Sequence, residues 1–120
     1  MSLLAATITV RFTQSGYHRW DQAPRSRAYL RQRHRHLFHV SVTTPVRHLN
    51  RELEFHDLID AATQELRMFC DSRRGETYNF GNRSCEDIAS GLATRLRDVY
   101  DRSFTVSVFE DGECGATASS

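Results

Sequence analysis

Two amphipathic stretches constrain most strongly what this chain can fold into. In residues 55–69, apolar side chains recur every three or four positions: Phe55, Leu58, Ile59, Ala62, Leu66 and Phe69. In residues 85–100, the apolar stripe is Ile88, Ala89, Leu92, Leu96 and Val99. This spacing is typical of helices that bury one face, and Ser84 is a favoured residue just before a helix. We therefore expect one helix at 55–69 and another at about 85–100.

Shorter runs alternate apolar with polar residues, as half-buried strands do. They cover residues 5–12, 36–44 and 104–109, with a short fourth candidate at 114–117, and Pro45 ends or kinks the second run. Residues 13–33 contain Gly16 and Pro24 and show no period. We expect a long functional loop there, with a short extended return at Tyr29 and Leu30. The order of elements predicts an α+β fold, an antiparallel four-stranded sheet with two helices on one face.

Length and charge limit the function classes. The chain has 120 residues, enough for one modest core, so we expect a single domain over residues 1–120. A formal net charge of +1 gives no general attraction to nucleic acid, and we predict no nucleic-acid partner. Cys70, Cys85 and Cys114 are irregularly spaced, and no basic-then-apolar leader or long apolar span is seen. We therefore expect a cytoplasmic protein without a membrane partner.

Histidines suggest a metal site. His34 and His36 begin a predicted strand, where alternation places both imidazoles on one face. With His18, three neutral nitrogen donors could hold a zinc ion and leave its fourth position open, which is the layout of a catalytic metal. The alternative is that these histidines are ordinary polar residues on a half-exposed strand.

Several short motifs together carry a family resemblance. They are Phe12 with His18-Arg-Trp, His34-Arg-His36-Leu-Phe, Glu54-Phe-His-Asp-Leu, Ser84-Cys-Glu86-Asp-Ile-Ala and Val106-Ser-Val-Phe-Glu110. In order and spacing they resemble the 6-pyruvoyl tetrahydropterin synthase and 6-carboxytetrahydropterin synthase family. The resemblance implies the T-fold (tunnelling fold), in which protomers join through their sheets into a barrel. It also implies a homo-oligomer, commonly a hexamer of two stacked trimers, with active sites between subunits.

The resemblance also implies roles for individual residues. A zinc ion held by His18, His34 and His36 would bind the side-chain hydroxyls of a dihydropterin substrate. Glu110 matches the pterin anchor, a carboxylate that accepts hydrogen bonds from a guanine-like edge. Ser84 and Glu86 fall beside the pterin pocket. Without the resemblance, Glu110 is an exposed acid before a turn, and Ser84 and Glu86 are explained by helix stability alone.

Two departures from the family concern proton transfer. Family members carry a catalytic cysteine shortly before the His-x-His pair, but this segment reads Tyr29-Leu-Arg-Gln-Arg. They also carry an Asp-His pair after the first helix, but Asp71 is followed by Ser72. We take Asp71 and Cys70 as candidate catalytic residues, with Cys70 a relocated thiol. A small hydrophobic role is the alternative for Cys70 and for Cys85, which lies near the pocket.

A cluster of arginines could bind phosphate groups. Guanidinium groups suit a triphosphate, although a solvated face is the alternative. The cluster comprises Arg25, Arg27, Arg31, Arg33 and Arg35.

The sequence therefore predicts a zinc-dependent lyase like 6-carboxytetrahydropterin synthase. Its substrate would be dihydroneopterin triphosphate, in 7-deazaguanine (queuosine-type) or pterin biosynthesis, with a divergent proton shuttle. The alternatives are another step on a related pterin or purine, and a homologue that binds a pterin-like ligand, or serves as a scaffold, without the family reaction.

Overall fold

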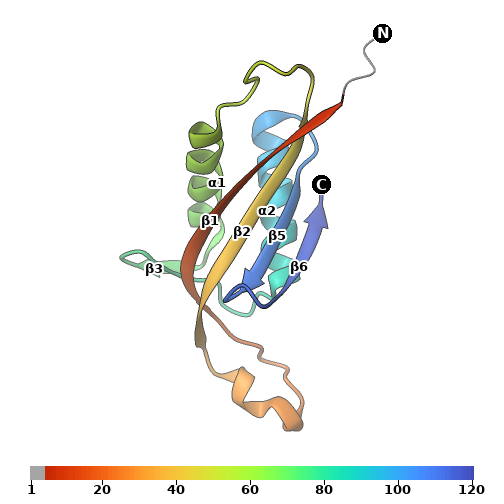
Figure 1. Cartoon of the computed structure of the whole chain (residues 1–120). Helices are drawn as coiled ribbons and strands as arrows, with labels where there is room; N and C mark the ends of the chain where they lie inside the picture. Colours follow the sequence, from red (N-terminus) through yellow and green to blue (C-terminus); the bar gives the residue numbers. More distant parts are fainter. Residues whose placement is uncertain (1–4) are drawn as a thin grey trace.

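A six-stranded sheet forms one layer of the molecule in this computed structural model, which describes residues 5–120 (Figure 1). In chain order the elements are β1 (Ala6–His18), the 3-10 helix η1 (Arg25–Arg31), β2 (His34–Val46), α1 (Phe55–Phe69), β3 (Ser72–Arg74), β4 (Thr77–Asn79), α2 (Cys85–Tyr100), β5 (Thr105–Glu110) and β6 (Cys114–Ser119). Both α-helices lie behind the sheet in Figure 1, on the same face. None of the helices within the described residues is long and apolar enough to cross a membrane.

The sheet differs from the prediction in strand number and direction. The α+β class is confirmed, but the antiparallel four-stranded sheet is wrong, because the strand order is β3-β4-β1-β2-β5-β6 and β4 runs parallel to β1. The two additional strands form a short hairpin after α1, which turns at Gly75 with a φ of +60°. A backbone with positive φ suits glycine, which has no Cβ to clash. The hairpin then extends the sheet beyond the edge of β1.

Both α-helices begin and end where the sequence predicts. In α1 the side chain of Glu54 accepts a hydrogen bond from the backbone N–H of Asp57. At the start of α2, Ser84 and Asp87 form a capping box, in which each side chain accepts from the other residue's backbone N–H. These caps satisfy N–H groups that have no partner inside a helix. The helix start beside the candidate site is therefore firmly fixed.

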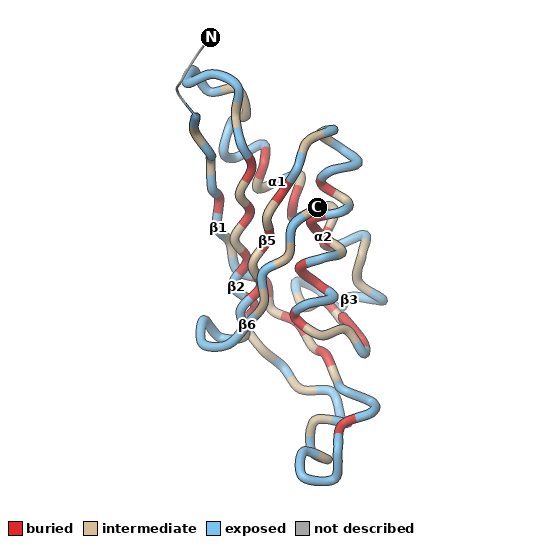
Figure 2. Tube along the Cα trace, turned by 90° about the vertical axis from the view of Figure 1, so that its right-hand side faces the viewer, coloured by how far each residue is buried: buried red, intermediate tan, exposed pale blue. Residues whose placement is uncertain are grey.

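The core lies between the sheet and the two helices, where Figure 2 shows the buried residues. Cross-strand register places Val10 beside Val42, and Val42 beside Val106, on the face toward the helices. All three are buried, as are Leu58 of α1 and Leu92 of α2. Burying side chains of this size contributes about 1.5–3 kcal/mol each.

Strands β1 and β2 are longer than predicted. The alternation of β1 continues beyond Phe12, because Gln14, Gly16 and His18 follow Val10 on the buried face. Gln14 is accommodated because its side-chain amide donates to the backbone oxygens of Ser15 and Glu76. Strand β2 continues through Pro45. Proline has no backbone N–H to donate, but β5 pairs only with residues 38–43, so no hydrogen bond to β5 is needed at Pro45. The predicted loop therefore starts six positions later, after His18.

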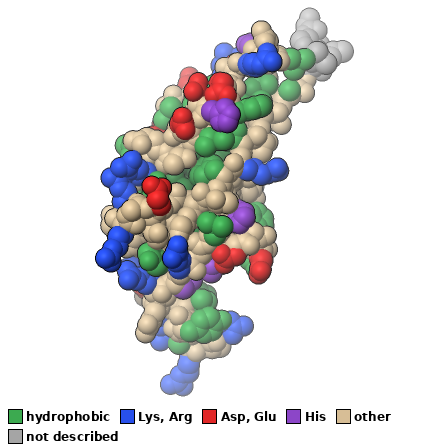
Figure 3. Space-filling model, turned by 60° about the vertical axis from the view of Figure 1, so that its left-hand side comes forward, with side chains coloured by type: hydrophobic (Ala, Val, Ile, Leu, Met, Phe, Trp, Pro, Cys, Tyr) green, Lys and Arg blue, Asp and Glu red, His purple; other side chains and the backbone are tan. Residues whose placement is uncertain are grey.

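The connection between β1 and β2, residues 19–33, forms an arm that projects from one end of the sheet (Figure 1). Tyr29 and Leu30 lie in η1, so the predicted extended return is wrong. The arm closes on itself because the N–H of Trp20 donates to the carbonyl of Leu30 at 2.8 Å. Basic side chains stand out at its tip, at the bottom of Figure 3.

Candidate metal and ligand site

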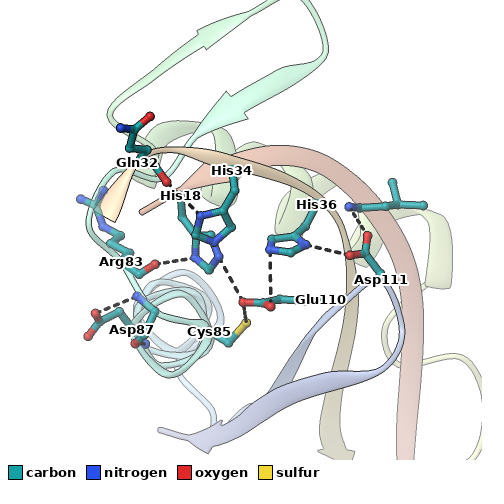
Figure 4. Close-up of polar contacts among 11 residues, drawn as sticks. His18, Gln32, His34, His36, Arg83, Cys85, Asp87, Glu110 and Asp111 are labelled. Carbon is teal, nitrogen blue, oxygen red and sulfur yellow. Dashed lines mark hydrogen bonds and ion pairs between the residues drawn. The ribbon is translucent and has the colours of Figure 1, made fainter. Parts of the chain in front are cut away.

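Three histidines converge at the end of the sheet that carries the arm (Figure 4). His18 ends β1, His34 begins β2, and these two residues are cross-strand partners. His36 follows two positions later on the same face of β2, so all three continue the row of core side chains. One ligand atom from each lies within 4.8 Å of the others. The convergence predicted from the sequence is thus present.

The Nδ1 atom of every one of these histidines faces a hydrogen-bond acceptor. Nδ1 of His18 lies 2.9 Å from the carbonyl oxygen of Arg83, and Nδ1 of His34 lies 3.1 Å from that of Gln32. A carbonyl can only accept, so Nδ1 carries the proton in both rings. Nδ1 of His36 lies 2.7 Å from a carboxylate oxygen of Asp111. Metal-binding histidines are typically oriented in this way, with Nε2 left for the ion.

His18 provides a direct test of whether a metal fits. Its Nε2 atom is buried without a hydrogen-bond partner. Burial is the largest cause that lowers the pKa of His18, and it outweighs the opposing effects of the Arg83 carbonyl and of Glu110. A neutral ring offers a lone pair on Nε2, and a buried polar atom without a partner is costly. The donor set therefore suits a divalent transition metal such as zinc.

Two consecutive acids of β5 and its turn contact the histidines. The carboxylate of Glu110 lies 3.1 Å from Nε2 of His18 and 3.5 Å from Nε2 of His36. Asp111 accepts from the backbone N–H of Leu37 at 2.9 Å as well as from His36. The backbone bond from Leu37 is the first cause that holds the pKa of Asp111 below its usual value, and His36 is the second. Glu110 thus faces Nε2 of two histidines, and Asp111 orients one ring from behind.

The N-terminus of α2 closes another side of the site. Ser84, Cys85 and Glu86 line the cavity in front of the histidines. The thiol of Cys85 donates to Glu110 at 3.7 Å. Burial, followed by the charge of Glu110, raises the pKa of Cys85 to about 12, so Cys85 stays protonated near neutral pH. The thiol of this cysteine therefore acts as a hydrogen-bond donor toward Glu110.

The cavity has a volume of about 760 Å³, which is suitable for a small organic ligand. It is lined by the residues that the sequence predicted for the metal and substrate site: His18, His34, His36, Ser84, Glu86 and Glu110. Residues that sequence reasoning did not assign to it are Arg19, Trp20, Tyr29, Leu30, Asn82, Arg83, Cys114 and Gly115. Most come from the arm or from the turn before α2, whose place beside the histidines depends on tertiary folding. The place of Cys114 in the cavity could have been predicted from the sequence, because it follows Glu110 across a short turn.

Cys70 and Asp71 do not line this cavity. The thiol of Cys70 donates to the carbonyl of Arg67 at the end of α1. The carboxylate of Asp71 pairs with the guanidinium of Arg83 at 2.6 Å. Asp71 therefore contacts the residue whose backbone carbonyl holds His18, but neither side chain reaches the cavity within one chain.

The arginine cluster also lies outside the cavity, which is lined by Arg19 and Arg83 instead. Arg35 donates to Ser15, and Arg33 lies over the ring of Tyr17. Arg19 and Arg83 are paired with Asp21 and Asp71. The cluster therefore does not line this cavity within one chain, and phosphate binding by it stays a prediction.

Comparison with known proteins finds likeness in structure alone. No family model matches the sequence, and no curated protein matches it. A catalytic-residue mutant of 6-pyruvoyltetrahydropterin synthase from Plasmodium vivax has a TM-score of 0.61 at 11% identity, covering 98% of both chains. An uncharacterized protein from Wolinella succinogenes has a TM-score of 0.61 at 16% identity, covering 96% of this chain and 98% of the other. The Plasmodium falciparum synthase has a TM-score of 0.55 at 10% identity, covering 97% and 98%.

These matches span nearly the full length of both partners, so the likeness concerns the whole architecture. At these identities it shows the fold. The chain has the fold of 6-pyruvoyltetrahydropterin synthases, as the resemblance in its motifs predicted, and the T-fold prediction is confirmed at that level.

Proposed function

We propose that this protein is a zinc-dependent lyase similar to 6-carboxytetrahydropterin synthase. Its substrate is dihydroneopterin triphosphate, in 7-deazaguanine (queuosine-type) or pterin biosynthesis. The observation that carries the proposal is the set of three histidines, each held through Nδ1 and each lining a ligand-sized cavity. The fold shared with pterin synthases supports the substrate class.

The residues divide the work as follows. His18, His34 and His36 would hold the ion, while the Arg83 carbonyl and Asp111 keep two of the rings in the required tautomer. When bound, zinc supplies a Lewis acid that lowers the pKa of ligand hydroxyl groups and stabilises negative charge on their oxygens. Glu110 would accept hydrogen bonds from the guanine-like edge of the pterin.

Ser84 and Glu86 line the same cavity and are proposed as secondary substrate contacts. Trp20 and Tyr29 form part of the arm side of the cavity, where aromatic rings can cover a flat ligand and limit access of water.

Proton transfer by Cys70 and Asp71 stays a prediction. Since both lie outside the cavity of their own chain, this role needs a homo-oligomer in which they face the cavity of a neighbouring chain. We propose such an oligomer, a hexamer as in the family. It would also cover the free edge of β6, whose backbone groups pair with no further strand among the described residues.

Anaerobic incubation of zinc-loaded protein with 7,8-dihydroneopterin triphosphate, followed by mass spectrometry, tests the proposal. We expect a 6-carboxy- or 6-pyruvoyl-tetrahydropterin product that is lost in His34→Ala and retained in Asp98→Asn, an exposed change on α2. Unchanged substrate with the wild-type protein would refute the lyase function.

A second function, binding of a pterin-like ligand without the family reaction, is favoured by the missing cysteine before His34. Tyr29 and Leu30 line the cavity from that segment, and neither carries a thiol. Calorimetric titration with neopterin combined with the product assay separates the two functions, because a binding protein retains the ligand but yields no product from dihydroneopterin triphosphate.

A further inference from the structure

The position of Glu110 is unusual for a residue whose only task is to hold an organic ligand. Its two carboxylate oxygens approach two different histidines, Oε1 toward Nε2 of His18 and Oε2 toward Nε2 of His36. These nitrogens are the ones left free for a metal, since Nδ1 of each ring is already engaged.

The contact between His18 and Glu110 is not a hydrogen bond. Nδ1 of His18 is engaged by the carbonyl of Arg83. Nε2 of the same ring is buried and has no hydrogen-bond partner, although the carboxylate of Glu110 lies 3.1 Å away. A cation placed between the nitrogen and the carboxylate would give both groups a partner.

Two separations, from Glu110 to His18 and to His36, agree with shared coordination. Zinc–nitrogen and zinc–oxygen bonds of about 2.0–2.1 Å in a tetrahedral site place neighbouring ligand atoms roughly 3.3 Å apart. The two contacts of Glu110 with ring nitrogens, 3.1 and 3.5 Å, lie on either side of that value. Glu110 comes from β5, whereas the histidines come from β1 and β2, so the acid completes the set from a third strand.

We propose that Glu110 is a fourth protein ligand of the metal in the ligand-free protein, and that it leaves the metal when a pterin-like ligand binds. The inference rests on the proposed metal site. Both oxygens face the histidines in the ligand-free arrangement, so the same carboxylate cannot also recognise a guanine-like edge. Ligand binding therefore opens the coordination position that the resting protein closes.

Neighbouring contacts allow the side chain of Glu110 to move while its backbone stays fixed. The following residue, Asp111, bonds to both the N–H and the carbonyl of Leu37, which holds the end of β5 against β2. The side chain of Glu110 is 30% exposed toward the cavity, and its remaining contact is the thiol of Cys85. A rotation of the Glu110 side chain is therefore enough for the exchange.

Zinc affinity and cobalt spectra test this inference without an activity assay. Zinc affinity is measured by competition with a chromophoric chelator for wild-type protein, Glu110→Gln, Glu113→Gln and His34→Ala. Glu113 provides the matched control, because it carries the same charge in the same turn but is exposed and does not line the cavity. We expect Glu110→Gln to weaken zinc binding at least about tenfold, Glu113→Gln to leave it unchanged, and His34→Ala to weaken it more than Glu110→Gln.

The Co²⁺-loaded protein then reports the exchange. We expect neopterin to change the visible spectrum of the wild-type Co²⁺ protein, and the ligand-free spectrum of Glu110→Gln to differ from that of the wild type. Equal affinity and an equal spectrum for wild type and Glu110→Gln would overturn the role of Glu110 and leave the three-histidine site intact. Wild-type protein that binds neither ion would overturn both this inference and the metal site of the proposed function.

Discussion

Replacement of Asp111 by asparagine should disable His36 as a metal ligand while keeping the shape of the site. The two carboxylate oxygens of Asp111 accept from two different donors, the N–H of Leu37 at 2.9 Å and Nδ1 of His36 at 2.7 Å. An asparagine side chain has one oxygen and one NH₂ group, so it can accept only one of these bonds. If its oxygen keeps the bond to Leu37, the NH₂ group faces Nδ1 of His36. The ring then relieves the clash by moving its proton to Nε2, the atom needed for the metal.

The loss of such an orienting partner typically lowers metal affinity about 10- to 100-fold. We expect a change of this size for Asp111→Asn in zinc competition with a chelator, with Asp98→Asn on the exposed side of α2 as the charge-matched control. Long-range ¹⁵N NMR of the imidazoles gives the tautomer of His36 independently. Zinc affinity within twofold of the wild type, with the proton of His36 still on Nδ1, would refute the reasoning.

Two other predictions follow from the packing and from the thiols. A Cβ at Gly16 would lie 2.8 Å from the ring of Phe80 and 3.0 Å from the carbonyl oxygen of Tyr78, so Gly16→Ala should lower the free energy of unfolding by about 1–3 kcal/mol. Urea unfolding of Gly16→Ala measures this change, and Thr13→Ala, on the exposed face of β1, is the control. Equal unfolding midpoints for Gly16→Ala and the wild type would contradict the prediction. Iodoacetamide at pH 8 should modify exposed Cys114 first, Cys70 more slowly and buried Cys85 last. Burial is the largest cause that raises the pKa of Cys70 and of Cys85, and a raised pKa leaves less of the reactive thiolate. Peptide mass spectrometry gives the order, and faster labelling of Cys85 than of Cys114 would show that the site is arranged differently.

The sequence predicted the elements whose pattern is long and regular. The bounds of α1 and α2 agree because an apolar stripe runs along most of each helix and Ser84 marks the start of α2. The β3–β4 hairpin was missed because each strand has three residues and Tyr78 is the one buried side chain among them. The extension of β1 was missed because Gln14 and Gly16 look like loop residues, although they occupy core-facing positions.

The histidine cluster was predictable because two of its members lie in one strand with a spacing of two. The groups that orient these histidines were not. Two of them are backbone carbonyls, of Gln32 and Arg83, and every residue carries a carbonyl. Asp111 looked like an ordinary turn acid, and its contact with His36 depends on the register between β2 and β5. Sequence patterns identify ligands, whereas the groups that position them follow from the completed fold.

The hydrogen bonds that hold His18 and His36 join residues 65 and 75 positions apart in the chain. No early hairpin or isolated helix can contain the finished site, and contacts of this separation generally form late in folding. An ion that binds the completed site would therefore draw the chain toward its native state, by about 2.7 kcal/mol at a free concentration one hundred times its dissociation constant. For such a chain, the supply of metal would determine how many molecules remain folded as well as how many are ready to bind a ligand.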